Sequence, residues 1–226
     1  MTFSSLVEEN MSKKKFIPAL GYKFLSNYYD LAIKTVMPEN KVRTRLVDLL
    51  NPNSYENILE FGFGTAQNLI LLKQRNSQVP VMGVDIDASI KAIAEEKLKR
   101  YNLQVPLHLY DGTCLPFNDN FFDKVFSSLV FHQLDRETKL HCLKELHRVL
   151  KPQGKLIIGD WGKAQNKLMR LLFFSIQLLD GFKTTQDNVK GLMPQFISNA
   201  DFVDILEVGF LNTKVGTFSY YLARKP

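Results

Sequence analysis

Residues 57–66, Asn-Ile-Leu-Glu-Phe-Gly-Phe-Gly-Thr-Ala, constrain the fold more than any other segment of this chain. An apolar run ends in an acid, Glu60, and the chain then turns on Gly62 and Gly64 before a stretch with helical character over 65–75. A strand that enters a helix through a glycine turn brings bare backbone N–H groups beside the helix N-terminus. Glycine permits a positive φ and a close approach of a ligand to the main chain. The pattern is typical of the nucleotide-cofactor turn of a doubly wound α/β domain.

The spacing of the glycines bears on which nucleotide would fit. The dinucleotide fingerprint G-x-G-x-x-G requires glycine at position 67, where this chain has Gln67. The S-adenosylmethionine (SAM) pattern requires glycine at position 66, where this chain has Ala66 and so departs by one methyl group. Taken alone, the turn leaves open a strand-to-helix connection that binds no ligand.

Two later apolar runs also end in acids. Asp85 follows the run 79–84 and lies 21 residues after Gly64. An acid at about this distance is suited to hydrogen-bond both hydroxyls of a ribose, a feature common to NAD and SAM sites. Asp111, followed by a glycine, ends the run 105–110. Its carboxylate can accept a hydrogen bond from an adenine amino group.

Further motifs follow in order: Leu-Pro-Phe at 115–117, Phe-Asp at 122–123 and Arg-Val-Leu-Lys-Pro-Gln-Gly at 148–154. With the glycine turn and the two acids, this series resembles the class I SAM-dependent methyltransferases. It looks most similar to the ubiquinone/menaquinone biosynthesis C-methyltransferases and their small-molecule relatives. The resemblance is strong over roughly residues 55–160.

The chain departs from the family pattern at two positions. Ala66 replaces the third glycine of the turn and is expected to crowd the methionine end of the cofactor slightly. Gln153 replaces a frequent glycine in a later turn, where we expect little effect.

Alternating strands and helices predict an α/β fold that is doubly wound and Rossmann-like. The resemblance implies a seven-stranded, mostly parallel sheet whose last strand is antiparallel. Strands are expected near 57–61, 80–85, 105–110, 121–127, 154–160, 203–211 and 215–223, and helices near 65–75, 88–101 and 136–150.

We expect a single domain over 1–226 in four parts. These are an N-terminal helical cap (1–52), a cofactor-binding core (53–160), a lid or insertion over the site (161–200) and a C-terminal strand hairpin (201–226). Helical spacing of apolar residues over 12–36 supports the cap.

The insertion leaves its role open. Its apolar stretch Lys167–Leu179 is too short and too charged at its start to span a bilayer. It can be a core helix, a lid over an apolar substrate or a membrane-surface helix. Residues 180–192 indicate a polar, mobile loop.

The resemblance implies cofactor contacts at the carboxyl ends of the strands. Two glycines cradle the methionine part while an acid orients their turn, and a backbone carbonyl meets the methionine ammonium. A second acid takes the ribose hydroxyls, an apolar residue packs on adenine, and an acid–glycine pair reads the adenine edge. An aromatic residue of the cap is a further candidate, and an ordinary packing role is as plausible for it. The two glycines are Gly62 and Gly64, the acid that orients their turn is Glu60, and the carbonyl belongs to Ser128 or Leu129. Asp85 is the acid for the ribose, and Ile86 is the apolar residue on adenine. Asp111 and Gly112 are the acid–glycine pair, and Tyr29 is the aromatic residue of the cap.

Two further residues are candidates for the acceptor side. His132, just after the fourth strand, can act as a catalytic base or touch the substrate, against an alternative role in local packing. Trp161, after the fifth strand, can form a wall of the acceptor pocket or simply pack in the core. A base is needed only if the acceptor loses a proton before it attacks the methyl group. The transfer itself is an in-line displacement on a methyl group that the cofactor has already activated.

The composition narrows the classes of partner. The net charge of +6 favours anionic partners, but the scattered basic residues form no nucleic-acid module. Two cysteines and four histidines show no metal-ligand spacing and no disulfide framework, so we expect no metal.

The lack of a disulfide framework and of a secretory signal in the first residues predicts a cytoplasmic protein. The leading hypothesis is a SAM-dependent methyltransferase that acts on a small apolar or amphipathic acceptor and yields S-adenosylhomocysteine (SAH). Transient contact with a membrane surface is possible, and the oligomeric state is open. The alternatives are a non-catalytic SAM-binding regulator and an NAD-dependent oxidoreductase.

Overall fold

The computed structural model describes residues 37–226. Seven strands form one sheet in the order β3-β2-β1-β4-β5-β7-β6. The strands β1 to β5 pair in parallel, whereas β7 is antiparallel to both β5 and β6. The predicted mostly parallel sheet with an antiparallel last strand is therefore confirmed. The strands are β1 Ile58–Phe61, β2 Val81–Asp85, β3 Leu107–Leu109, β4 Phe122–Ser128, β5 Leu150–Trp161, β6 Val203–Asn212 and β7 Thr217–Arg224.

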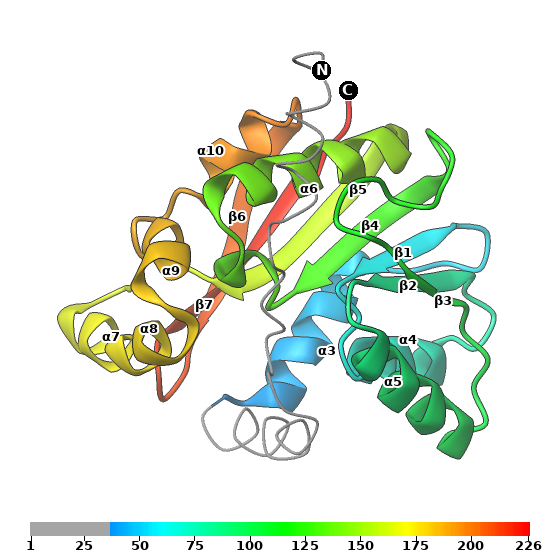
Figure 1. The fold of residues 1–226 in the computed structure, drawn as a ribbon, viewed down its shortest axis with the longest axis horizontal. Helices are drawn as coiled ribbons and strands as arrows, with labels where there is room; N and C mark the ends of the chain where they lie inside the picture. The colour runs from blue at the N-terminus through cyan, green and yellow to red at the C-terminus, as the bar shows by residue number, and fades with distance from the viewer. Residues whose placement is uncertain (1–36) are drawn as a thin grey trace, which may run out of the picture.

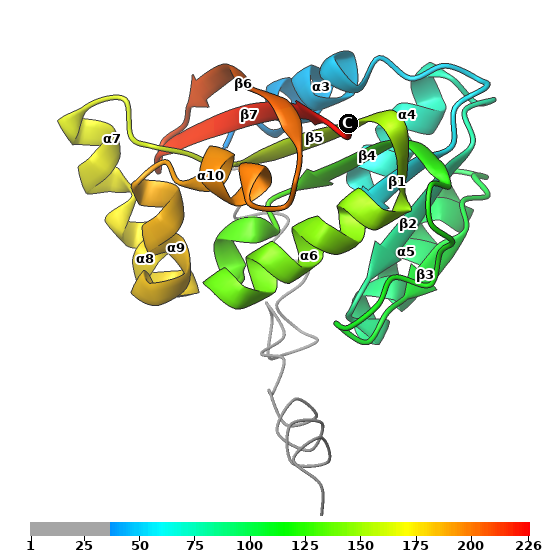
Figure 2. The same cartoon turned by 90° about the horizontal axis from the view of Figure 1, so that it is seen from above.

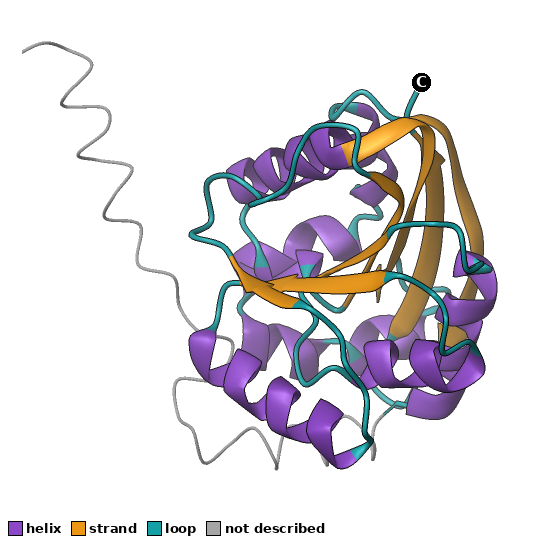
Figure 3. Ribbon diagram, turned by 90° about the vertical axis from the view of Figure 1, so that its right-hand side faces the viewer, coloured by secondary structure: helices purple, strands orange, loops and turns teal. Residues whose placement is uncertain are grey.

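Helices cover both faces of the sheet, as Figures 1 and 3 show. One core lies between the sheet and α3, α4 and α5, and the other between the sheet and α6 and α10. All four residues of β1 are buried, as expected for a strand covered on both faces. The helices are α3 Glu39–Leu50, α4 Gln67–Arg75, α5 Ala88–Arg100, the 3₁₀ helix η1 Phe131–Gln133, α6 Arg136–Val149, α7 Lys167–Leu172, α8 Phe174–Asp180, α9 Phe182–Val189 and α10 Met193–Ser198.

Side-chain caps define where the main helices begin. The Asp87 carboxylate accepts hydrogen bonds from the N–H groups of Ser89 and Ile90 at the start of α5. Asp135 accepts one from Thr138 at the start of α6. These caps satisfy N–H groups that have no partner within the helix. The starts of α5 and α6 are thus encoded locally, whereas α3 and α4 begin without a side-chain cap.

The two departures from the family pattern both occupy a left-handed backbone conformation. Ala66 has φ +61° and Gln153 has φ +65°. Glycine is preferred in such positions because an L-residue there is strained. The positive φ of Ala66 also delays the start of α4 to Gln67, two residues after the start that the sequence predicts.

The insertion differs from expectation in its second half. Residues 180–192, predicted to form a polar loop, contain the helix α9 and part of α8. Thr185, Asp187 and Asn188 of α9 are buried, so the polarity of these residues does not signal exposure. Asp187 is contacted by Arg136 and Lys139 of α6, and the Asn188 side chain donates to the Trp161 carbonyl. The expected apolar stretch forms two short helices, α7 and α8, rather than one.

The N-terminal helix expected over 12–36, and Tyr29 within it, lie outside the described residues. Within 37–226, no helix is long and apolar enough to cross a bilayer. The same part of the chain holds no cluster of side chains suited to a metal ion.

Candidate active site

The strand order reverses between β1 and β4, and the carboxyl ends of these strands meet the glycine turn. In open α/β sheets, ligands bind beyond such ends at this switch point. Gly62 and Gly64 both have positive φ, +73° and +51°. A Cβ at Gly62 would lie 2.3 Å from Val130 Cγ2, whereas a Cβ at Gly64 would meet nothing within 4 Å. Gly62 therefore permits packing against Val130, and Gly64 leaves open space at the turn.

Asp85, at the end of β2, is hydrogen-bonded to the glycine turn. The Gly64 N–H donates to Asp85 Oδ2 at 3.0 Å, and the N–H groups of Ile86 and Asp87 donate to Oδ1 at 2.8 and 3.1 Å. Burial raises the pKa of the Asp85 carboxyl, and these three donors oppose the rise. Because a carboxylate offers about four acceptor positions, Asp85 retains capacity for a further donor.

Glu60 is buried at the end of β1 and is only half satisfied. Asn68 Nδ2 donates to Glu60 Oε1 at 2.7 Å, while Oε2 has no hydrogen-bond partner among residues 37–226. Burial raises the pKa of Glu60 to about 8, with Asn68 and Arg43 opposing it. A buried acceptor without a donor is costly, so this oxygen marks a place where a ligand donor or water fits.

A hydrogen-bonded relay connects Glu60 to α3. Arg43 donates from Nη1 to Asn68 Oδ1 and from Nε to Glu39 Oε1, each at 2.7 Å. Sequence reasoning missed Asn68 and Arg43, because the relay joins elements 25 residues apart. The local signal for Asn68 was an asparagine near the start of the helix that follows the glycine turn, and the structure shows that this asparagine is buried.

The acid and glycine after β3 lie beside Ile86. A Cβ on Gly112 would be 3.4 Å from Ile86 Cδ1, and Gly112 has φ +87°. Asp111 is exposed, and its Oδ1 accepts from the Thr113 N–H at 2.8 Å and from the Thr113 hydroxyl at 2.5 Å. These two bonds lower the pKa of the Asp111 carboxyl. Gly112 thus lies beside Ile86, and the adenine contacts expected for Ile86, Asp111 and Gly112 stay a prediction.

The end of β4 bends sharply at Leu129. This residue has φ +59°, and its N–H donates to the Gly159 carbonyl on β5 at 2.9 Å. Ser128, the last residue of β4, is half-buried. The bend changes the direction of the backbone at Ser128 and Leu129, where a carbonyl is expected to meet the ligand.

His132 and Asp160 form a buried pair beyond β4 and β5. Asp160 accepts from the His132 N–H at 3.0 Å, and its Oδ1 lies 2.7 Å from His132 Nδ1. The Trp161 N–H donates to the same carboxylate at 2.7 Å. A proton on Nδ1 satisfies the carboxylate and leaves the lone pair of the ring on Nε2. This is the arrangement of a histidine base oriented by an acid, and sequence reasoning gave Asp160 no such role.

The insertion that carries α7 to α9, which we call the lid, also contacts Trp161. The rings of Trp161 and Phe173 lie 5.6 Å apart, and Asn188 Nδ2 donates to the Trp161 carbonyl at 2.7 Å. Asn188 Oδ1 and Gln177 Oε1 are buried without a partner in the described part of the chain. Trp161 and the insertion therefore combine packed aromatic rings with two buried polar atoms that have no partner among the described residues.

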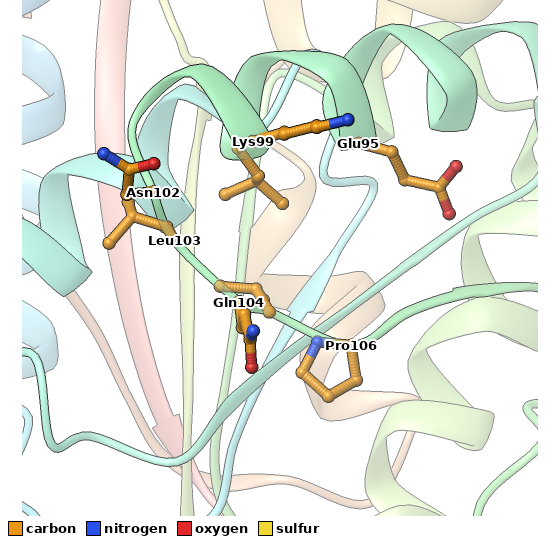
Figure 4. Close-up of a pocket in the computed structure, with 8 residues that line it drawn as sticks. Glu95, Lys99, Asn102, Leu103, Gln104 and Pro106 are labelled. Carbon is orange, nitrogen blue, oxygen red and sulfur yellow. The ribbon is translucent and has the colours of Figure 1, made fainter.

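A cavity of about 770 Å³ lies elsewhere, at the C-terminal end of α5 and the loop that precedes β3 (Figure 4). It is lined by Glu95, Leu98, Lys99, Asn102, Leu103, Gln104, Val105 and Pro106. This is the amino end of the strand, whereas the glycine turn and the acids lie at the carboxyl ends. We therefore do not assign the cavity to the site.

The sequence matches the family described as "Methyltransferase domain" over residues 59–158. It is 34% identical over 119 residues to the demethylmenaquinone methyltransferase of Thermus thermophilus, covering 53% of each protein. The chain spans about half the length of the curated relatives it matches.

Solved structures share the fold. A SAM-dependent methyltransferase from Aquifex aeolicus superposes with a TM-score of 0.59 at 20% identity, covering 85% of this chain and 96% of that one. The [4+2]-cyclase SpnF superposes with a TM-score of 0.60 at 18% identity, covering 80% of each chain. The family match over residues 59–158, the curated relatives and the shared sheet together make this chain similar to the class I SAM-dependent methyltransferases.

Proposed function

We propose that this protein transfers a methyl group from SAM to a small apolar or amphipathic acceptor. The observation that carries the proposal is the pair of features at the glycine turn. Gly64 faces open space, and beside the turn Glu60 holds a buried oxygen without a partner. A ligand with a cationic amino group would satisfy that oxygen by donating a hydrogen bond. The part of the ligand that lies against the main chain can approach closely because residue 64 is a glycine.

The residues at the strand ends fit the parts of the cofactor. Glu60 and the Leu129 or Ser128 carbonyl would hold the methionine amino group at the turn formed by Gly62 and Gly64. Asp85, already fixed by the Gly64 N–H, would accept from the ribose hydroxyls.

At the adenine end, Ile86 would pack on the ring, and Asp111 with Gly112 would read its edge. The contact between Gly112 and Ile86 supports this placement. Tyr29 remains a further proposed contact from the N-terminal region. Together these residues would fix the orientation of the cofactor.

SAM supplies an activated methyl group and a neutral leaving group, so the hard chemistry belongs to the cofactor. The protein's task is to align the acceptor and exclude water, for which orientation can supply roughly 7–11 kcal/mol. Trp161 and Phe173 form the apolar side of the acceptor region. Asn188 and Gln177 carry the buried polar atoms that can fix a polar group of the acceptor.

His132 is the proposed base for an acceptor that must lose a proton. Asp160 holds the imidazole through Nδ1 and would stabilise the charged ring after proton transfer. The edge contact between His132 and Trp161, with ring centres 6.4 Å apart, supports a position of the pair beside the proposed acceptor wall. The two free thiols, Cys114 and Cys142, support the further proposal that the protein works in the reducing cytoplasm.

A thermal-shift titration with SAH and SAM tests the proposal, with NAD as a comparison ligand. SAH and SAM should raise the melting temperature, and NAD should not, because position 67 carries Gln67 instead of glycine. Gly64→Val should abolish the shift. Gly209→Val is the matched control, since Gly209 also has positive φ and open space around its Cβ but lies on β6. No shift with millimolar SAH would refute the proposal.

A second function receives specific support from the likeness to SpnF, a cyclase. The same fold can therefore serve a reaction other than methyl transfer, and fold does not fix function. A non-catalytic SAM-binding regulator is a separate alternative. Retained SAH binding together with an acceptor region that admits no small molecule in a ligand-soaked crystal would favour this reading.

A further inference from the structure

The lid exposes a set of large apolar side chains along α7, α8 and the start of α9. We call this set the outer lid face: Leu168, Leu171, Phe174, Leu178 and Phe182, exposed by 58%, 64%, 41%, 74% and 48%. Leu168 and Leu171 lie three residues apart on α7, and Phe174 and Leu178 lie four apart on α8, so each pair shares one side of its helix. The rings of Phe174 and Phe182 lie 6.3 Å apart, which brings the start of α9 to α8. Single exposed apolar residues are ordinary, but five gathered in 15 residues mark an interaction surface.

The opposite side of the same helices is also apolar. Met169, Phe173 and Ile176 are buried, and Phe173 packs against Trp161. A helix that is apolar all round requires cover on both sides. Among the described residues, the buried side packs into the core that contains Trp161, whereas the five residues of the outer lid face are exposed. The helices α7 and α8 lie at one end of the molecule, far from α4 and α5 (Figures 1 and 2).

The charges near the outer lid face indicate what covers it. Residues 161–192 contain five lysines or arginines and two acids, and one of those acids, Asp187, is buried and paired with Arg136. Lys163 and Lys167 are exposed beside the first leucines. The Arg170 guanidinium lies over the Phe174 ring, 4.2 Å from its centre. Exposed lysines next to an apolar face, which we call the basic rim, complement an anionic lipid surface.

We propose that the outer lid face docks on an anionic lipid bilayer, with its leucines and phenylalanines below the headgroups and the basic residues at the phosphates. A second copy of the chain is less suitable as the partner, because a symmetric pairing would bring the two basic rims together. Docking at this face does not depend on methyl transfer. It would, however, place an apolar acceptor region beside the source of apolar molecules.

Flotation with lipid vesicles tests the docking with the whole chain. Vesicles of phosphatidylcholine with phosphatidylglycerol should carry the protein at low salt, and vesicles of phosphatidylcholine alone should carry much less. The variant Leu168→Ser/Leu171→Ser/Leu178→Ser should lose at least about tenfold in partition coefficient. Its matched control, Tyr55→Ser/Tyr101→Ser/Leu206→Ser, removes equally exposed apolar groups elsewhere and should float like the wild type.

Charge variants provide an independent arm. Lys163→Glu/Lys167→Glu should lower the partition coefficient for the anionic vesicles by about fivefold for each lysine replaced. Lys41→Glu/Lys99→Glu, on α3 and α5, should have little effect.

Three outcomes would overturn the proposal: no flotation of the wild type, equal flotation of the lid variants, or a dimer in gel filtration that the serine variant disrupts. The last would assign the face to a second copy. SAH binding measured on the same variants separates this proposal from the cofactor site, since it should not change.

Discussion

The glycine-turn region and the lid region of this molecule are held by different kinds of interaction. Around the turn, backbone N–H groups and positive-φ residues do most of the positioning, as in the bond from Gly64 to Asp85. In the lid, side chains from distant segments meet, as with Asn188 and the Trp161 carbonyl or Asp187 and Arg136. Backbone geometry leaves a short motif in the sequence, whereas side-chain pairing across the fold does not. The proposed cofactor can therefore be predicted from the sequence, whereas the acceptor cannot.

The largest effect is expected at the buried pair of Asp160 and His132, next to the lid region. Asp160→Ala leaves three donors, two on His132 and the N–H of Trp161, without their buried acceptor. Breaking such a pair should lower the free energy of unfolding by about 4 kcal/mol, measured by urea denaturation. SAH affinity measured below the transition should stay the same. If it falls in parallel, the two regions are not separable.

Next in size is a contrast within the glycine turn. Gly62→Ala adds a Cβ 2.3 Å from Val130 at φ +73° and should destabilise the fold by about 3 kcal/mol. Gly64→Ala meets no atom within 4 Å and should cost only about 1 kcal/mol of stability. It should still weaken SAH binding, because its methyl group occupies the open approach. Equal losses of stability in thermal melts would remove the distinction between the two glycines.

Asp85→Ala should weaken SAH binding by about 2 kcal/mol in isothermal titration calorimetry, because ribose hydroxyls lose a charged acceptor. Asp87→Ala, which removes the cap of α5 two residues further on, is the control. It should lower stability with little change in affinity. A variant at Asp85 that binds SAH normally would exclude this residue from the site.

The pH dependence of stability should report Glu60. Its pKa is raised by burial from the ordinary 4.5 to about 8, so the folded state retains a proton that the unfolded state releases. The stabilising contribution is therefore complete below pH 4.5 and is lost as the pH rises towards 8. Within this window, stability should fall by up to about 1.4 kcal/mol per pH unit relative to Glu60→Gln. Parallel curves for the two proteins would contradict the assignment.

The smallest expected effect is at Ala66. Ala66→Gly relieves the left-handed strain at φ +61° but gives the unfolded chain more freedom. The net gain should be about 0.5 kcal/mol, detectable as a slightly higher melting temperature. A loss of stability would show that the alanine methyl group, which is buried, contributes more by packing than it costs in strain.

Much of the fold was predictable because its signals are local. The strand that contains Glu60, the glycine turn and the position of Asp85 follow from apolar runs that end at acids and glycines. The spacing of the glycines also points away from the dinucleotide fingerprint. The register of the sheet then brings together residues that the sequence places at successive strand ends.

Other features could not be read from the sequence for physical reasons. The pairing of His132 with Asp160 joins residues 28 apart through a fold-dependent contact. The helix α9 was expected to be a loop because buried Asp187 and Asn188 are polar, and only their partners on α6 and β5 make burial tolerable. Arg43 reaches the turn from α3 through Asn68, and no spacing rule connects them.

A crystal structure with SAH tests the central assignment most directly. We expect its ribose hydroxyls on Asp85, its amino group at the unpartnered oxygen of Glu60 and its sulfur facing the side of Trp161 and His132. SAH bound instead in the cavity between Glu95 and Pro106, or failure of saturating SAH to appear at the glycine turn, would contradict it.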